Sequence, residues 1–506
     1  MLKNLAANLF GRFWGVFSNF IFLPLYVKYL GVNQYGIISL ALVITVFISL
    51  MDAGMTATIT RELANNENDS IKKINIFRTL DSIYLIVALI TSLSVFLFST
   101  SIVGLINSEG HKPEILILCI KIIGIEIGFK LLSQFYSGGL LGLDKQIELN
   151  KYKILWGIFR NGFVVLVIIY SNSIISFLLW QCLVTIIYSF LIRLRLINIL
   201  YQTIGLKNYF TKFKIDITIL KSIKNYTLGM LLISIVVAIN TQVDKLILSS
   251  LLSLEILAYY TLAFTLSKAL NLIVEPIKTT VLPTIISLYT SEKSQEGSKI
   301  FKFTNYLICI IVFPISSLFI VYPEMLLYLW TNNMDVAKSS SIYLVPLTIG
   351  NLFLTIQLLP FNVAIANKFT KYNNVIGFVS LFVFVPGSYY LISLFGGLGS
   401  AYLYAFVQII IAIIYTYLIN RKFINLSLKE LWFNPVIILI TSLLFGYFVS
   451  TTLVFSNNRF IDLTYLGIIF LLSGLINLLI ISLLDNVFKN WIKTKMLEQW
   501  GKIKFY

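Results

Sequence analysis

Histidine and cysteine are scarce in this chain, which has one histidine and three cysteines among 506 residues. The single histidine, His111, has no neighbours with which it could ligate a transition metal. Cys119, Cys182 and Cys309 lie within apolar runs, so we expect small hydrophobic residues and no disulfide framework. The phosphate-loop pattern G-x-x-x-x-G-K-[ST] is absent, and no G-x-G-x-x-G follows a strand. The sequence therefore predicts neither metal-dependent hydrolysis nor the consumption of ATP, and no cofactor.

Charged residues are also few, at 12% of the chain against about 25% in soluble domains, while hydrophobic residues reach 58%. Long uncharged runs recur along the whole length, and about 20 apolar residues are enough to span a bilayer. Examples are residues 37–51, 83–106, 229–243 and 465–484. Arg12 interrupts the first run and no small-residue cleavage site follows, so we expect an uncleaved first helix and not a signal peptide.

The runs predict an all-α polytopic membrane protein with about fourteen transmembrane helices. The expected spans are residues 9–28, 35–56, 80–106, 114–140, 154–171, 174–192, 226–250, 257–289, 304–324, 342–363, 375–395, 399–419, 434–455 and 463–485. Of the 39 Lys and Arg residues, 28 fall on one side of these spans and four on the other, so the positive-inside rule predicts that both termini are cytoplasmic. The net charge of +17 follows this topology and does not indicate nucleic-acid binding.

A basic stretch at residues 193–224 divides the chain, and we interpret it as a topology determinant and interfacial helix. The predicted domains are an N-terminal six-helix lobe (1–195), a basic cytoplasmic linker (196–225), a C-terminal six-helix lobe (226–432), and helices 13 and 14 with a basic cytoplasmic tail (433–506). Residues 30–41 weakly resemble residues 252–263 at an offset of 222. This repeat favours two bundles in parallel orientation, with chance similarity of apolar stretches as the alternative.

Basic residues inside the expected spans are functional candidates, because a charge in the bilayer costs about 2.5 kcal/mol or more. The alternatives are snorkelling at a helix end and pairing with an acid. Lys268, Asn271, Glu275 and Lys278 share one helical face, which predicts a polar stripe along a cavity. Glu275 and Lys278 are spaced to neutralise each other, whereas no acid follows Lys268 at the third or fourth position. The seven basic residues are Arg12, Lys121, Lys130, Arg160, Lys245, Lys268 and Lys278.

Two prolines, Pro276 and Pro283, predict a kink or break in the helix that carries this stripe. Three pairs of glycines spaced by four residues are expected to be helix-packing contacts rather than chemical sites. These are Gly11 with Gly15, Gly124 with Gly128, and Gly138 with Gly142.

The N-terminal spans carry further candidates. Arg12 lies on a polar face of the first helix and either faces a cavity or snorkels, while Asp52 is either its partner or a helix-end acid. Arg61 follows at the inner end of the second helix. Glu126 precedes Lys130 by four residues, which predicts an ion pair next to a cavity-facing ammonium.

The other charged residues in the expected spans have structural interpretations as well as functional ones. Lys121 is about 180° round the helix from Lys130, so we expect it to serve helix packing or the outer interface. Arg160 lies where it can snorkel. For Asp244 and Lys245, a salt bridge and a substrate contact both remain open.

Several motifs carry a family resemblance. Pro24-Leu25-Tyr26-x-x-Tyr29-Leu30-Gly31-x-x-x-Tyr35-Gly36, Asp52-Ala53-Gly54 and Thr60-Arg61-Glu62-Leu63-Ala64 resemble the opening of the polysaccharide transporter family. Asp244-Lys245-Leu246-Ile247-Leu248, which leads into Leu257-Ala258-Tyr259-Tyr260, resembles the same family. This family contains the Wzx-type O-antigen flippases and belongs to the multidrug/oligosaccharidyl-lipid/polysaccharide superfamily.

The resemblance implies two six-helix lobes in a V around a central cationic cavity, with two further C-terminal helices. It implies translocation of undecaprenyl-pyrophosphate-linked oligosaccharides across the bacterial inner membrane by alternating access, for O-antigen or capsule synthesis, with polysaccharide polymerase machinery as a possible partner besides membrane lipids. Arg12, Lys130 and Lys268, joined by Lys278 and Arg61, suit the cavity. The acids available for Na+ or H+ coupling are Asp52, Asp244 and Glu275.

Three other functions stay open at this point. A polytopic glycosyltransferase or polymerase usually has sizeable outer loops, whereas the longest outer segment expected here, residues 325–341, is short. A drug/cation antiporter of the same superfamily should have more acids than bases in its spans. Here seven bases face four acids, once Asp81, Glu114 and Asp485 are assigned to span edges. A lipid scramblase or scaffold is the third alternative.

Overall fold

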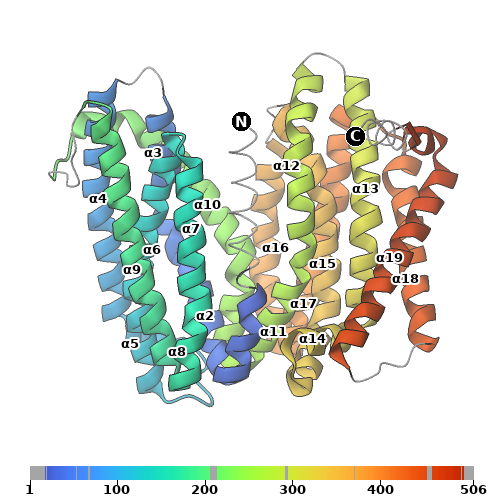
Figure 1. Ribbon diagram of the computed structural model, residues 1–506, viewed down its shortest axis with the longest axis horizontal. Helices are drawn as coiled ribbons and strands as arrows, with labels where there is room; N and C mark the ends of the chain where they lie inside the picture. Colours follow the sequence, from blue (N-terminus) through green and yellow to red (C-terminus); the bar gives the residue numbers. More distant parts are fainter. Residues whose placement is uncertain are drawn as a thin grey trace, which may run out of the picture. The chain divides into compact units, whose positions relative to one another are not determined.

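The computed structural model describes residues 18, 20–52, 54–65, 69–205, 213–290, 294–367, 369, 371–452, 458–491 and 493–494. Within these residues all regular secondary structure is helical and no strand occurs, which confirms the predicted all-α class. In the same residues, twelve helices are long and apolar enough to cross a membrane. The protein is therefore a multi-pass membrane protein (Figure 1).

The helices form two compact units. Unit 1 comprises the described residues of Met1–Thr261 and Val385–Gly397, and unit 2 those of Leu262–Phe384 and Leu398–Tyr506. The helices within unit 1 are α2 (Val32–Ile48), the 3-10 turn η1 (Ser49–Asp52), α3 (Met55–Ala64), α4 (Ser70–Leu97), α5 (Ser99–Gly104), α6 (Pro113–Gly142), α7 (Gln146–Gly157), the π-helical η2 (Ile158–Phe163), α8 (Val164–Ser171), α9 (Ile174–Gln202) and α10 (Ile217–Leu251).

Unit 2 holds most of the remaining helices. These are α12 (Ala269–Thr290), α13 (Ser294–Val321), α14 (Pro323–Thr331), α15 (Met334–Ala366), α17 (Gly397–Ile419), the π-helical η3 (Asn420–Ile424) and η4 (Lys429–Phe433), α18 (Asn434–Thr452) and α19 (Arg459–Leu484). Two helices, α11 (Leu254–Ser267) and α16 (Lys371–Phe395), contribute to both units. In unit 2, α13 packs against α12, α15, α18 and α19 (Figure 1).

Helix α6 forms the centre of unit 1, where it contacts α3, α4 and α9 (Figure 1). Its small residues allow this close approach. A Cβ added to Gly128 would lie 2.0 Å from Ser92 Oγ, and one added to Gly142 would lie 2.5 Å from the carbonyl oxygen of Thr60. These two glycine pairs are therefore helix-packing contacts, as their spacing predicted. Gly11 and Gly15 of the third pair lie outside the described residues.

The order of the helices follows the predicted spans. The twelve membrane-length helices correspond to twelve of the fourteen. The predicted first span corresponds in part to a shorter apolar helix, Phe20–Leu30, and the fourth to α6, which has 30 residues but carries four charged side chains. The count of fourteen stays a prediction, as do the four domain boundaries and the V-shaped arrangement.

Some predicted boundaries are wrong. Helix α4 begins at Ser70, ten residues before the expected span, because Asp69 caps it by accepting a hydrogen bond from the Lys72 N–H at 2.6 Å. The basic stretch 193–224 contains no separate interfacial helix in its described residues, since they extend α9 and begin α10. The outer segment 325–341 is also helical, in α14 and α15.

Of the kink or break predicted at two prolines, no break is present in the described residues. Helix α12 runs through both Pro276 and Pro283 without interruption. The interruption lies at Lys268, between α11 and α12, where the Asn271 N–H bonds to the Lys268 carbonyl at 3.0 Å. The Lys268 carbonyl also accepts from the Leu272 N–H at 3.4 Å, so a three-residue bond is added there to the usual four-residue spacing.

Candidate functional site

The buried acid of α6 is neutralised by a distant residue. Glu126 is 7% exposed and accepts hydrogen bonds from Arg160 Nη2 at 2.7 Å and Nε at 3.2 Å. Thr185 on α9 donates to the same carboxylate at 3.3 Å. The predicted ion pair of Glu126 with Lys130 is therefore wrong, and Arg160, which lies where it can snorkel, is the partner instead. The π-helical segment η2 carries Arg160, and such segments often occur at functional sites.

Lys130 is therefore not neutralised by Glu126. It is half-buried on α6, and among the described residues no carboxylate forms an ion pair with it. Its ammonium lies close enough to Glu126 and Arg160 for electrostatic interaction with both. Because those two cancel each other, the three charged side chains together carry one net positive charge inside unit 1.

In unit 2, the predicted ion pair of α12 is present. Lys278 Nζ lies 2.6 Å from Glu275 Oε2, so the pair adds no net charge. Asn362 on α15 donates to the backbone carbonyl of Lys278 at 3.0 Å. Lys268, by contrast, is exposed at the helix interruption, with its ammonium 4.7 Å from the centre of the Phe264 ring.

One residue of the predicted polar stripe of α12 contacts α15. The Asn271 side chain is bonded to a buried polar network. Its side-chain amide donates to Asn351 Oδ1 at 3.0 Å, and its Oδ1 accepts from Thr355 Oγ1 at 2.6 Å. Sequence reasoning missed Asn351 and Thr355 on α15. Their spacing of four residues within an apolar helix is a signal that could have found them.

The candidate coupling acids have different surroundings. Asp244 forms an ion pair with Lys245 at 3.2 Å and accepts from the Tyr260 hydroxyl at 2.8 Å, so the salt-bridge interpretation of this pair is the one the structure shows. Asp52, the last residue of η1, accepts from the Thr56 N–H in the first turn of α3 at 3.2 Å and also from the Tyr84 hydroxyl. Asp52 is thus a helix-end acid. Arg12, its alternative partner, lies outside the described residues.

A further acid was wrongly assigned to a span edge. Asp81 lies twelve residues into α4, is 3% exposed, and bonds to Arg193 at 2.8 Å and to the Tyr136 hydroxyl at 2.8 Å. The helix cap at Asp69 is the sequence signal that would have placed it inside. Like Glu126, Asp81 is neutralised by an arginine of the same unit.

The remaining predicted residues lie apart from these clusters. Arg61 on α3 is exposed and forms an ion pair with the adjacent Glu62 at 3.0 Å. Lys121 lies 5.1 Å from the centre of the Phe96 ring, as a residue with a packing role would. The described residues contain no group of three or more His, Cys, Asp or Glu side chains that could hold a metal ion.

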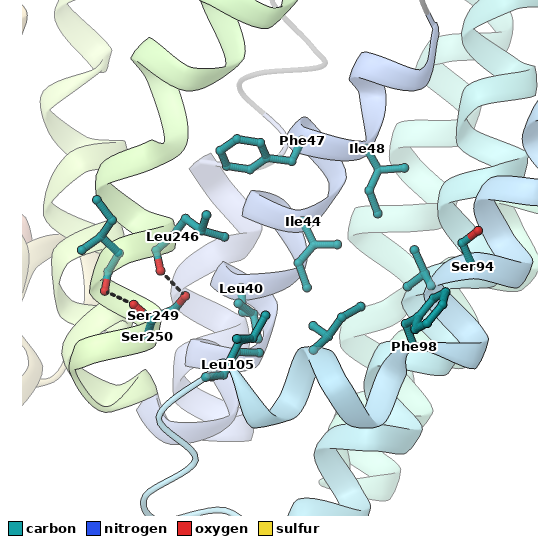
Figure 2. A pocket seen from close by; sticks show the side chains of 14 residues that line it. Leu40, Ile44, Phe47, Ile48, Ser94, Phe98, Leu105, Leu246, Ser249 and Ser250 are labelled. Atoms are coloured by element: carbon teal, nitrogen blue, oxygen red, sulfur yellow. Dashed lines mark hydrogen bonds between the residues drawn. The ribbon is translucent and has the colours of Figure 1, made fainter. Parts of the chain in front are cut away.

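Unit 1 also contains an apolar cavity of about 560 Å³ between α2, α4, α5 and α10 (Figure 2). Leu40, Ile44 and Phe98 are among the side chains that line it. The hydroxyls of Ser249 and Ser250 in its wall already donate to backbone carbonyls, at 2.7 and 2.9 Å. The cavity therefore suits hydrocarbon and not a sugar or a phosphate.

The sequence matches a known family over more than half its length. Residues 1–289 match the model of the family described as "Polysaccharide biosynthesis protein". The chain belongs to this family. The match confirms the resemblance to polysaccharide transporters noted in the motifs around Tyr35 and Arg61.

A curated relative and two solved structures extend the likeness. The chain is 21% identical over 423 residues to a Shigella flexneri protein named "Putative O-antigen transporter", covering 83% of this chain and 98% of that protein. The lipid II flippase MurJ in an inward closed conformation superposes with a TM-score of 0.73 at 18% identity, covering 96% of this chain and 100% of MurJ. An inward-facing multidrug resistance MATE transporter gives 0.67 at 13% identity, covering 81% and 94%. The two solved structures share the fold of this chain.

Proposed function

We propose that this member of the polysaccharide biosynthesis family is a flippase. Its substrate is an undecaprenyl-pyrophosphate-linked oligosaccharide, which it moves across the bacterial cytoplasmic membrane by alternating access. The product supplies a surface polysaccharide such as O-antigen or capsule. Family membership supports a role in polysaccharide biosynthesis, and the names of the Shigella relative and of MurJ support movement of a lipid-linked sugar.

The net charge within the spans carries the proposal. Glu126, Asp81 and Glu275 are each neutralised by a basic partner, whereas Lys130 is left as a net positive charge in unit 1. Lys268 adds a cation at a helix interruption in unit 2. A pyrophosphate moved through hydrocarbon without counter-charges would meet a prohibitive desolvation penalty, and fixed ammonium groups reduce it.

Each part of the substrate has a matching chemical environment. Each of the two ammonium groups, that of Lys130 in unit 1 and that of Lys268 in unit 2, can form charge-assisted hydrogen bonds with a pyrophosphate, and these are stronger than neutral ones. The sugar units occupy hydrated space lined by hydroxyl, amide and aromatic groups. The polyprenyl chain stays in the surrounding lipid, because isoprene units have no polar group that needs a partner. The chain moves this substrate without converting it chemically.

The drug/cation antiporter is the alternative with which the proposal competes, since a MATE transporter shares the fold. Such a carrier needs acids that stay available for a cationic ligand. In this chain Asp244 and Glu275 are bonded to Lys245 and Lys278. Asp52 accepts hydrogen bonds from Thr56 and Tyr84. Coupling of transport to Na+ or H+ at these three acids is not part of the proposed function.

A null strain tests the function. Loss of the gene should trap lipid-linked repeat units on the inner leaflet and remove a surface polysaccharide, and the wild-type gene should restore it. Persistence of the surface glycan together with reduced export of a cationic dye would replace the flippase with the antiporter.

A further inference from the structure

One buried amide side chain bonds to residues on both sides of the helix interruption at Lys268. Asn351 on α15 is fully buried. Its Nδ2 donates to Ser267 Oγ, the last residue of α11, at 2.8 Å. Its Oδ1 accepts from Asn271 Nδ2, in the first turn of α12, at 3.0 Å. The turn that carries Lys268 is thus held at both ends by a neighbouring helix.

The same amide is itself held by α17. The Tyr404 hydroxyl donates to Asn351 Oδ1 at 3.2 Å. The Tyr404 ring packs edge-on against Phe264 with ring centres 5.4 Å apart, and the Lys268 ammonium lies 4.7 Å from the Phe264 ring. The backbone on either side of Lys268 and the ring beneath its ammonium therefore depend on one connected set of contacts within unit 2.

We propose that Asn351 is a positioning residue that fixes where the Lys268 ammonium stands for the pyrophosphate. This inference rests on the proposed function, in which Lys268 holds the substrate anion. At this turn the Lys268 carbonyl is shared between the Asn271 N–H at 3.0 Å and the Leu272 N–H at 3.4 Å, so the backbone bonding is less regular than in a continuous helix and side-chain contacts help to set its geometry. Small errors in the placement of a charged group weaken its interaction with a substrate steeply.

The test uses a double-mutant cycle in the null strain, with surface polysaccharide measured per amount of membrane protein. Asn351→Ala should reduce function about tenfold in the wild-type background. In the Lys268→Ala background the same change should reduce function by less than about twofold, because the cation it positions is already gone. Equal fold-losses in both backgrounds would overturn the inference and show that Asn351 only supports the fold.

A matched control is available in the same unit. Asn477 on α19 is also fully buried, and it exchanges hydrogen bonds with Ser442 on α18 at 2.8 and 3.1 Å. Asn477→Ala should give the same fold-change in both backgrounds. If Asn351→Ala fails to accumulate, Tyr404→Phe replaces it, since this change removes one donor to Asn351 and keeps the ring. It should show the same loss of effect when Lys268 is absent.

A second measurement separates this inference from the proposed function. In purified Lys268→Cys protein, the introduced thiol is labelled with a maleimide, and the three native cysteines are buried. Adding Asn351→Ala should change the labelling rate more than about threefold, and Asn477→Ala should not. If Asn351→Ala changes the labelling rate while the strain carrying Asn351→Ala makes normal surface polysaccharide, the positioning stands and the role of Lys268 in transport is refuted. Unchanged labelling would refute the positioning and leave the proposed function standing.

Discussion

Ser39 and Thr261 share a hydrogen bond of 2.6 Å between their hydroxyl oxygens, and they stand 222 residues apart. That separation equals the offset of the sequence repeat between residues 30–41 and 252–263. A two-fold relationship between two repeats brings equivalent positions near the axis into contact, and this bond is what such an arrangement would give. The contact lies within unit 1 and favours a true repeat over chance similarity.

The close packing of α2 against α11 also makes position 36 sensitive to a larger side chain. A Cβ added to Gly36 on α2 would lie 2.2 Å from the carbonyl oxygen of Leu254 on α11, so backbone must move. We expect Gly36→Ala to destabilise the protein by about 1–3 kcal/mol. Thermal unfolding in detergent, followed by size-exclusion chromatography, measures it. Gly104→Ala is the matched control, since a Cβ there would meet nothing within 4 Å, and equal unfolding temperatures for the two variants would contradict the contact.

The ion pair of Glu126 and Arg160 is expected to be structural. Arg160→Ala leaves a buried carboxylate without its main partner and should destabilise the protein by about 3–5 kcal/mol. Replacing both residues, as Glu126→Gln with Arg160→Met, should destabilise it less than Arg160→Ala alone, because no charge is then left unpaired. A double variant that unfolds earlier than Arg160→Ala would contradict this explanation.

Lys130, next to that pair, is expected to act on transport and not on folding. Lys130→Met keeps most of the side-chain volume and removes the charge. It should leave the unfolding temperature almost unchanged and reduce polysaccharide export about tenfold or more. A variant with normal export and lower stability would make Lys130 a structural residue.

The ion-pair cluster around Lys302 in unit 2 predicts a pH dependence of stability. Lys302 bonds to both Asp485 and Glu430, at 2.8 and 2.9 Å. Burial alone would raise the pKa of Asp485, but the hydrogen bonds from Lys302 and from the Phe488 N–H hold that pKa below its ordinary value. Because the folded pKa is lowered, the stabilisation is complete above about pH 4 and disappears as the pH falls through the folded pKa.

Unfolding temperatures between neutral and acidic pH test this dependence. Asp485→Asn should lower the unfolding temperature at neutral pH, and the difference from wild type should shrink as the pH approaches the folded pKa. If the difference stays constant with pH, Asp485→Asn changes only packing, and the charge interaction with Lys302 does not account for it.

The transport activity of Lys268 variants should follow the charge of the side chain at this position. Lys268→Arg should keep part of the activity, since the cation persists with different geometry. Lys268→Ala should lose about tenfold or more with little effect on insertion, and Lys268→Glu should abolish activity by repelling the pyrophosphate. Lys121→Ala is the control, because its ammonium lies over Phe96. If the Lys268→Glu variant functions as well as the wild-type protein, transport does not need a cation at this position.

The sequence predicted local features well and distant partners poorly. Helix order and the Glu275–Lys278 pair depend on hydropathy and on residues three positions apart, which a sequence displays directly. The partner of Glu126 is 34 residues away on a π-helical turn, and only the fold brings it near. Asn351 was missed for the same reason, since its partners lie on α11, α12 and α17.

Movement of the lipid-linked substrate by the purified protein tests the central claim most directly. Proteoliposomes would carry a fluorescent undecaprenyl-pyrophosphate-linked oligosaccharide, and a membrane-impermeant quencher would report the fraction in the outer leaflet. The account predicts that this fraction exceeds the one in protein-free vesicles and in vesicles with Lys268→Glu protein. Equal fractions in all three preparations, with the wild-type protein folded by size exclusion, would contradict it.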